Sequence, residues 1–213
     1  SLLAKLSKEY KIEQFIHLSA LGINEAIDSD YAKSKLDGEL NIQKNFITAT
    51  ILRPSVVYSV DDNFTTNFMT LLNRLPFFPL YYNGDTKFMP IHCSDLTNTI
   101  YHIISKNINS KIIECVGLET ISLKDILKKL LKITGKKRFL IPFPLFVSKI
   151  TANFFELFSK PLLTLDQLRL LKYNNIKSGK YQTNFDIGSP SICYFETEVV
   201  KYSYMWRDGG QFS

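Results

Sequence analysis

Several features that mark common protein classes are scarce or missing in this sequence of 213 residues. Its nine glycines include no Gly-x-Gly and no Gly-x-x-Gly spacing, so the sequence has no glycine-rich loop of the kind that holds a phosphate at the start of a helix. No apolar stretch reaches the ~20 residues that a transmembrane helix needs. The longest apolar run, between 139 and 147, is interrupted by Pro142 and Pro144. The sequence therefore predicts no transmembrane segment.

Cysteine and histidine are also rare. The three cysteines are widely separated and odd in number, which fits neither a disulfide framework nor the spacing of metal ligands. We interpret them as reduced packing residues in a reducing compartment: Cys93, Cys115 and Cys193. The three histidines have no carboxylate at ligand spacing and are interpreted as structural: His17, His92 and His102. The sequence predicts no metal site.

The charge balance is mildly basic. Lysine and arginine number 26 and the acidic residues 20, a formal charge of +6, with an isoelectric point near 9.1. Nucleic-acid binding needs such charge concentrated on one face, and the one dense basic cluster lies between 128 and 138. A solvated helix face is the preferred interpretation, and contact with an acidic partner or an anionic lipid surface is the alternative. No nucleic-acid partner is predicted.

The first 53 residues alternate between helical and extended patterns. Apolar spacing predicts helices over 1–11 and 31–45 and short strands over 14–19 and 48–53. Ser29 or Asp30 is the expected N-cap of the second helix. Such alternation is typical of a parallel α/β sheet with right-handed crossovers. The rest is less regular, with the following elements expected: helices over 62–75, from Ser94-Asp95 to about 106, from the capping box Ser122–Asp125 to Gly135, over 145–158, from the capping box Thr164–Gln167 to about 172, and near 195–205; strands over 87–92 and 111–116; extended chain over 139–144; and an aromatic turn over 76–82.

Tyr31 and Lys35 are the candidate reactive pair. Side chains four residues apart lie on one face of a helix. A phenol beside an ammonium is a plausible proton-transfer unit, because the positive charge favours the phenolate and is expected to lower the tyrosine pKa toward the working pH. A solvated tyrosine and lysine on a surface helix is the alternative.

The order strand, Ser19, loop, Tyr31-x-x-x-Lys35, strand, Arg53-Pro54 resembles the second half of the nucleotide-binding domain of short-chain dehydrogenases/reductases, above all the extended and atypical branches with nucleotide-sugar epimerases and dehydratases. The resemblance implies that Tyr31 is the general acid/base. It also implies that Lys35 binds the nicotinamide ribose and that Ser19 orients the substrate. The implied cofactor-binding residues are Tyr31, Lys35, Ser19, Pro54, Ser55, Val56 and Val57.

A narrower resemblance covers nearly the whole chain. Its blocks are 15–22, 49–58 followed by 61–64, 161–167 with 171–175, and 206–212. Together they resemble the NADPH-binding, Rossmann-fold accessory subunits of respiratory complex I and their bacterial relatives. The implied fold is α/β: the C-terminal half of a Rossmann-like parallel sheet with helices, plus a smaller mixed α/β region. The implied division is a partial NAD(P)-binding region over 1–60 and an interleaved substrate-type or docking region over 61–213.

The sequence departs from the resemblance in two ways. It lacks the glycine-rich strand-turn-helix that holds the cofactor pyrophosphate, and the ribose-reading residue that follows it, so we expect the chain to be a fragment. The catalytic hydroxyl of active epimerases tends to lie one place after Ser19, where this chain has Ala20. The catalytic set Tyr31, Lys35 and Ser19 is therefore expected to be vestigial. NADP(H) or NAD(H) is expected in the intact form, and weak or no binding in this chain alone.

Three functional hypotheses remain open. The first is a non-catalytic accessory or assembly subunit of respiratory NADH:quinone oxidoreductase, on the cytoplasmic or mitochondrial-matrix side and peripheral to the membrane through its partners. Its candidate docking surfaces are 128–138 and 145–158. The second is an active oxidoreductase, epimerase or dehydratase acting on a nucleotide sugar or ketone, with Tyr31 as acid/base. The third is a truncated remnant that cannot bind cofactor alone.

Overall fold

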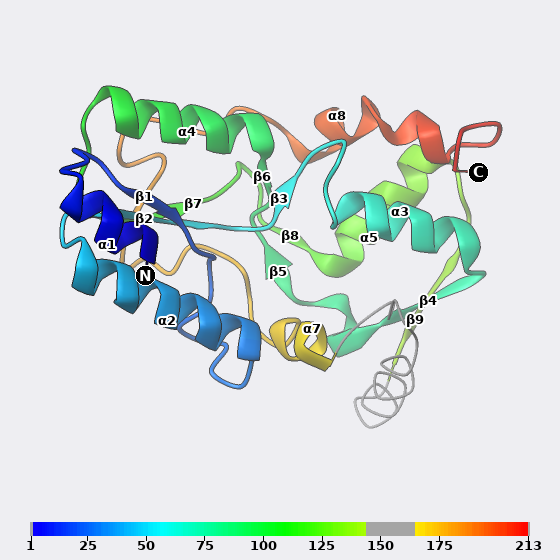
Figure 1. Ribbon diagram of the computed structural model, residues 1–213. Coiled ribbons are helices and arrows are strands. Elements are labelled where there is room, and N and C mark those ends of the chain that lie inside the picture. The colour runs from blue at the N-terminus through cyan, green and yellow to red at the C-terminus, as the bar shows by residue number, and fades with distance from the viewer. Residues whose placement is uncertain (1, 144–164, 213) are drawn as a thin grey trace.

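A four-stranded parallel sheet forms the left half of the molecule in Figure 1. The computed structural model describes residues 2–143 and 165–212. The strand order is β1 (Ile16–Leu18), β2 (Thr50–Pro54), β7 (Ile112–Cys115) and β10 (Gln182–Thr183), and every pairing is parallel. The predicted parallel α/β sheet is confirmed. Its strands come from both predicted regions, and whether these regions are separate domains stays a prediction.

Helices cover the two faces of this sheet (Figure 1). On one face lie α1 (Leu2–Glu9) and α2 (Asp30–Asn45), and on the other lies α4 (Cys93–Ser105). Strand β2 is buried on both faces because it is central and covered on each side. Helix α2 begins where predicted, because the hydroxyl of the N-cap Ser29 accepts a hydrogen bond from the Ala32 N–H at 3.2 Å.

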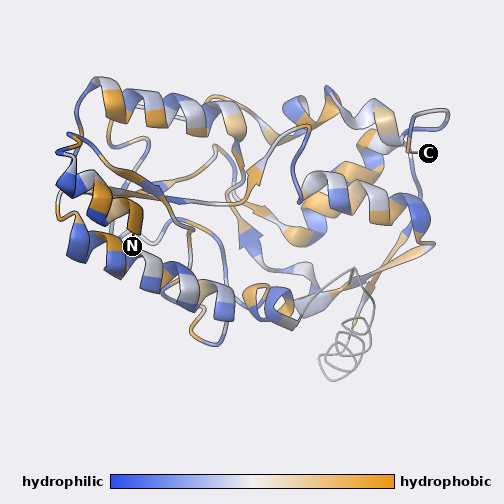
Figure 2. Ribbon diagram, viewed as in Figure 1, coloured by the Kyte–Doolittle hydropathy of each residue, from blue (hydrophilic) through white to orange (hydrophobic). Residues whose placement is uncertain are grey.

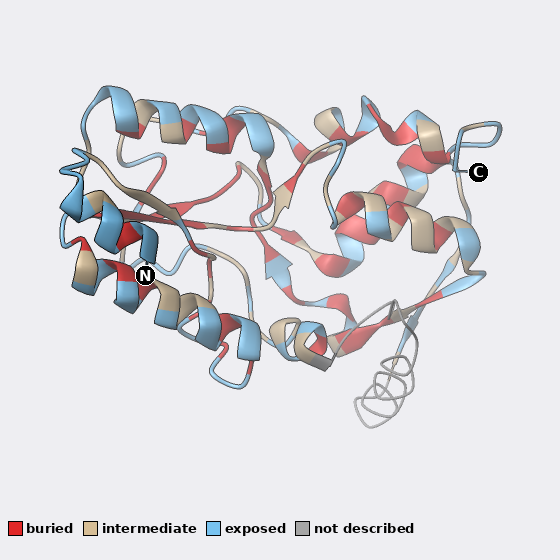
Figure 3. Cartoon of the chain, in the orientation of Figure 1, coloured by how far each residue is buried: buried red, intermediate tan, exposed pale blue. Residues whose placement is uncertain are grey.

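The second half of the molecule surrounds one large apolar cluster. Its elements are β3 (Val57–Tyr58), α3 (Thr65–Arg74), β4 (Phe77–Leu80), the 3-10 helix η1 (Tyr81–Gly84), β5 (Lys87–Phe88), β6 (Ile91–His92), β8 (Ile121–Ser122), α5 (Leu123–Thr134), β9 (Phe139–Pro142), α7 (Leu165–Leu170), α8 (Phe195–Val200) and the 3-10 helix η2 (Ser203–Trp206). Buried residues gather where α3, α5 and α8 face one another (Figure 3). The apolar stripe of α5 faces this cluster, and its charged side faces outward (Figure 2).

Helix α5 has the ends that its sequence predicts. The hydroxyl of Ser122 accepts from the Asp125 N–H at 3.1 Å, and Gly135 ends the helix in the left-handed conformation at φ +72°. The basic segment 128–138 is paired in part within the chain. Lys129 and Lys132 both contact the carboxylate of Glu196, at 2.8 and 3.3 Å. Lys136 contacts the carboxylate of Asp208 at 2.5 Å.

Three local predictions were wrong. The aromatic turn expected over 76–82 contains β4, which pairs in parallel with β9. The strand expected over 87–92 is two strands: β5 pairs with β8 and β6 with β3, and the change of partner occurs around Pro90, which has no N–H to continue a ladder. The N-cap of α4 is His92, whose side chain accepts from the Ser94 N–H at 3.3 Å.

Two further predictions concern the cysteines and residues 145–164. Cys115 is a buried packing residue as predicted, whereas Cys93 is exposed. The helix predicted over 145–158 and Thr164 of the predicted capping box lie outside the described residues. Within the described part of the chain, no helix has both the length and the apolar character needed to cross a membrane.

Candidate functional site

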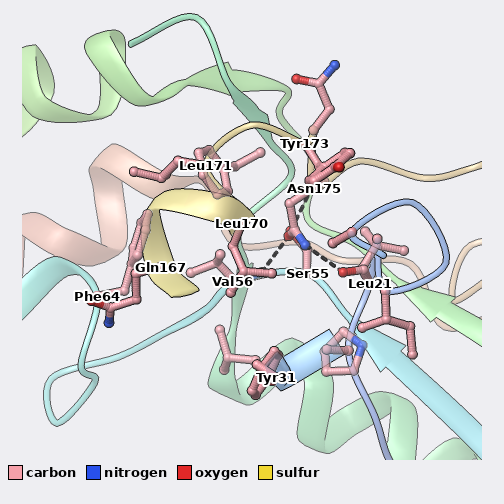
Figure 4. A pocket seen from close by; sticks show the side chains of 18 of the residues that line it. Leu21, Tyr31, Ser55, Val56, Phe64, Gln167, Leu170, Leu171, Tyr173 and Asn175 are labelled. Carbon is pink, nitrogen blue, oxygen red and sulfur yellow. Dashed lines mark hydrogen bonds between the residues drawn. The ribbon is translucent and has the colours of Figure 1, made fainter. Parts of the chain in front are cut away.

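A cavity of about 500 Å³ lies at the carboxyl ends of β1 and β2 (Figure 4). This end of a parallel α/β sheet is where ligands bind in doubly wound folds. The walls come from both halves of the molecule, including α2, α3 and α7. Six of the seven residues predicted to bind cofactor line it: Ser19, Tyr31, Pro54, Ser55, Val56 and Val57. Their roles in binding stay a prediction.

Lys35 is the predicted residue that is missing from the described lining. Its ammonium lies 5.6 Å from the centre of the Tyr31 ring and 3.5 Å from the Leu18 carbonyl oxygen. The ammonium therefore lies over the ring rather than pairing with the phenol oxygen. Burial raises the pKa of Tyr31 above its ordinary value. The expectation that Lys35 lowers this pKa was wrong, because desolvation by the cavity walls is the effect that prevails.

Ser19 brings an unpaired hydroxyl to the cavity. The residue is 5% exposed, and its Oγ has no hydrogen-bond partner among the described residues. Its N–H donates to the Leu52 carbonyl at 2.7 Å, which fixes the backbone after β1. A buried hydroxyl without a partner is costly in a folded protein. The position therefore suits a polar group of a ligand, and the neighbouring Ala20 cannot supply a second hydroxyl.

Asn175 joins the three segments that form the floor of the cavity. Its Oδ1 accepts from the Ser55 hydroxyl at 2.6 Å and from the Val56 N–H at 3.1 Å. Its Nδ2 donates to the Leu21 carbonyl at 2.9 Å. Figure 4 shows this amide between the two chain segments, with the three hydrogen bonds dashed. The neighbouring Gly22 has φ +78°, which favours glycine there. We call this set the Asn175 network.

Asp166 holds the helix that carries Tyr31. Its carboxylate on α7 accepts from the Ser29 hydroxyl at 2.9 Å and from the N–H groups of Asp30 and Tyr31 at 2.9 and 3.0 Å. These N–H groups at the start of α2 have no partners within the helix. Desolvation alone would raise the pKa of Asp166, but these hydrogen bonds and Arg169 outweigh it and hold the pKa below its ordinary value. We call this contact the Asp166 cap.

The described residues that line the cavity are apolar or polar without charge. Among the lining residues that the structure describes, none carries a charged side chain. One wall is strongly apolar: Phe64, Phe68, Leu71, Phe88, Leu170 and Leu171. The polar groups are hydroxyls and amides. They fit a nicotinamide and its ribose better than a pyrophosphate, which is normally held by backbone N–H groups of a glycine-rich loop or by cations.

The Asn175 network and the Asp166 cap are the parts of the site that the residue patterns did not predict. Asp166 and Asn175 both lie in the block 161–167 with 171–175 on which the narrower resemblance rests. The capping-box signal at Thr164–Gln167 indicated a helix start, but it gave no sign that Asp166 caps a different helix. Such contacts join residues far apart in the chain, and local patterns do not reveal them.

Comparison with known proteins relates the chain to a group of mitochondrial subunits. No family model matches it. It is 30% identical over 137 residues to NADH dehydrogenase [ubiquinone] 1 alpha subcomplex subunit 9 of Dictyostelium discoideum, covering 64% of this chain and 38% of that protein. It is 27% identical over 177 residues to the Mus musculus subunit of the same name, covering 82% and 47%. The chain is a homologue of these subunits.

Solved structures place this homologue of the alpha subcomplex subunit 9 proteins in a wider fold group. UDP-glucuronic acid 4-epimerase from Bacillus cereus, solved with UDP-glucuronic acid and NAD, matches with a TM-score of 0.67 at 19% identity, over 94% of this chain and 64% of that one. The dTDP-glucose 4,6-dehydratase DesIV from Streptomyces venezuelae, solved with NAD, matches with a TM-score of 0.65 at 15% identity, over 96% and 62%. The chain shares the Rossmann-like α/β fold of these epimerase and dehydratase structures. The chain spans about half the length or less of the curated subunits that it matches.

Proposed function

We propose that this chain belongs to a non-catalytic accessory subunit of respiratory NADH:quinone oxidoreductase, or complex I. The observation that carries the proposal is its similarity to the alpha subcomplex subunit 9 proteins of an amoeba, a plant and two rodents, at 26–30% identity. The epimerases and dehydratases share the fold at only 13–19% identity. The names of the relatives support a mitochondrial location, and the proposal places the subunit on the matrix side, peripheral to the inner membrane.

The chemistry of the cavity supports a role without turnover. The ammonium of Lys35 lies over the Tyr31 ring, and the pKa of Tyr31 is raised rather than lowered. A general base works best when its pKa is near the operating pH. Ala20 removes the hydroxyl that orients the substrate in active relatives. Among the described residues of the lining, none supplies a cation for the diphosphate of a nucleotide sugar.

A nicotinamide dinucleotide, NADP(H) or NAD(H), fits one end of the cavity. The unpaired Ser19 hydroxyl and the phenol of Tyr31 would bind the nicotinamide ribose, and the backbone from Pro54 to Val57 would line the nicotinamide. The Asp166 cap would hold Tyr31 in place, because it fixes the first turn of α2. Such a cofactor supplies hydride chemistry when a substrate is present. In this proposal it contributes stability by binding the folded state. We propose that the 213-residue chain alone binds it weakly.

Assembly with complex I is the test. The full gene product, tagged in its own cells, is expected to co-migrate with NADH dehydrogenase activity when native membranes are solubilised and separated on native gels. Recovery of the tagged protein only in the soluble fraction, away from that activity, would overturn the proposal.

A Tyr31→Phe variant distinguishes this role from the enzyme hypothesis. We expect the variant to assemble to the same level and to leave NADH:quinone activity within twofold of the wild type, because the phenol oxygen performs no chemistry. Turnover of a nucleotide sugar or ketone by the full-length protein, lost in Tyr31→Phe, would instead establish the active oxidoreductase or epimerase.

A further inference from the structure

A second cluster of reactive side chains lies outside the cavity, where β6, the loop before α8 and α8 meet. It consists of His92 at the end of β6, Cys193 in the loop and Glu198 on α8. One ligand atom from each residue lies within 4.8 Å of the other two. The Nε2 atom of His92 is 4.0 Å from a carboxylate oxygen of Glu198. His92 lies about 100 positions before Cys193 and Glu198, so the spacing of residues in the sequence could not reveal the cluster.

The three side chains are oriented and partly enclosed. The side chains of His92 and Glu198 are 18% and 14% exposed, and Cys193 is half-buried. Nδ1 of His92 lies 2.7 Å from the Ser94 hydroxyl, which fixes the ring and leaves Nε2 facing Glu198. Histidines that bind metals usually have their second nitrogen held in this way. The cluster is therefore sheltered but still open to an ion from solvent.

Tyr58 gives an independent sign of a ligand at this place. The residue is 0% exposed, and its hydroxyl has no hydrogen-bond partner among the described residues. Its ring packs edge-on against His92, with ring centres 5.1 Å apart. A buried hydroxyl without a partner, on a ring that packs against one member of the cluster, lacks the hydrogen bond that a bound water would provide.

The surroundings carry a surplus of acidic groups. Asp95 is 3% exposed and accepts from the Cys193 N–H at 3.1 Å, which places a second carboxylate beside the thiol. The cation paired with Glu198 is Lys201, at 2.6 Å, whose side chain is 64% exposed. An exposed ion pair of this kind is weak, so a divalent cation would compete with it effectively.

We propose that His92, Cys193 and Glu198 bind a zinc-type divalent cation, with a water on the fourth position that hydrogen-bonds to Tyr58. An imidazole, a thiolate and a carboxylate are a ligand set that Zn²⁺ accepts in tetrahedral sites. Zinc–ligand distances of roughly 2.0–2.3 Å put the ligand atoms about 3.5 Å apart, so the three must close by about 1 Å on binding. The ion would connect the end of β6 to α8.

Cobalt substitution tests the site directly. The chelator-treated, reduced 213-residue chain is titrated with Co²⁺ and then with Zn²⁺. We expect a thiolate-to-cobalt charge-transfer band with the visible bands of four-coordinate cobalt, and we expect zinc to displace both. The band should disappear in Cys193→Ser. In Glu198→Gln the affinity for Co²⁺ should fall at least ~10-fold, as for the loss of groups that hold a metal site.

The chain offers a matched control and a gain-of-binding variant. Cys93→Ser changes an exposed cysteine outside the cluster and should keep the band unchanged. Lys201→Met removes the competing ammonium and should increase the affinity for Co²⁺. Circular dichroism checks that each variant folds. A folded wild type that shows no thiolate–cobalt band, or a band that persists in Cys193→Ser and disappears in Cys93→Ser, would overturn the proposal.

Discussion

The face of the sheet under α2 and the cluster around α5 bury side chains of opposite character. Under α2, Arg53 and Glu39 form a two-bond ion pair at 2.9 and 2.6 Å, with side chains only 5% and 4% exposed. Glu114, beside Arg53 on β7, is 2% exposed and accepts from Ser178. Around α5, the cluster is formed by aliphatic and aromatic residues from α3, α5, α8 and the three two-stranded sheets β3-β6, β4-β9 and β5-β8.

This difference shows two ways to hold one fold together. Apolar packing tolerates changes that conserve volume, because its attraction has no direction. A buried ion pair tolerates almost no change to one partner, because the other charge is then left without compensation. The guanidinium of Arg53 also lies 4.8 Å from the Tyr181 ring, so the pair connects α2, β2 and the chain before β10. The sheet half is therefore expected to be the more sensitive to single substitutions.

The largest effect is expected from Arg53→Met. It leaves the carboxylate of Glu39 buried and unpaired, which should lower the free energy of unfolding by ~3–5 kcal/mol in urea titrations. The matched control is Lys33→Ala, which breaks an exposed pair with Asp30 and should change it by less than ~0.5 kcal/mol. The double variant Arg53→Met, Glu39→Leu should recover most of the loss. If Arg53→Met lowers the free energy of unfolding by less than ~1 kcal/mol, the sheet half is not more sensitive to single substitutions than the cluster around α5.

A smaller loss is expected from Leu130→Ala on α5. Leu130 is 0% exposed within the apolar cluster, and its truncation leaves a cavity that should cost ~3 kcal/mol. The volume-conserving Leu130→Met should cost less than ~1.5 kcal/mol. Equal losses for the two variants would show that shape, and not burial alone, determines stability around α5. Urea titration monitored by circular dichroism gives both values.

The smallest effect concerns the Asp166 cap, where the two halves meet. Asp166→Ala removes a cap of α2 and should cost ~1 kcal/mol near neutral pH. Because the folded pKa of Asp166 is lowered, this contribution is complete above the unfolded value of about 3.9 and is lost as pH falls through the folded pKa. The difference between wild type and variant should therefore shrink below about pH 4. Asp37→Ala on the exposed part of α2 is the control and should show no comparable pH-dependent difference.

The sequence predicts best what is local. The order of helix and strand over 1–53, Ser29 as a cap of α2 and both ends of α5 follow from neighbouring residues. It predicts poorly what depends on distant partners. The sequence of β4 contains Pro79 and is typical of a turn. It forms a strand because it pairs with β9, which follows α5 in the sequence. Six of the residues that the resemblance implied line the cavity, whereas the Asn175 network joins residues up to 154 positions apart.

The Asn175 network also affects when the cavity can form during synthesis of the chain. Chains emerge from the ribosome N-terminus first, so β1, α2 and β2 are available long before Asn175, and β10 follows later still. Until then the apolar wall at Phe64, Phe68 and Leu71 has no cover from α7 and the 173–175 segment. Contacts of such long sequence separation form late, and the apolar surface exposed meanwhile favours aggregation. The nascent chain is therefore expected to depend on chaperones most strongly during synthesis of residues 75–175.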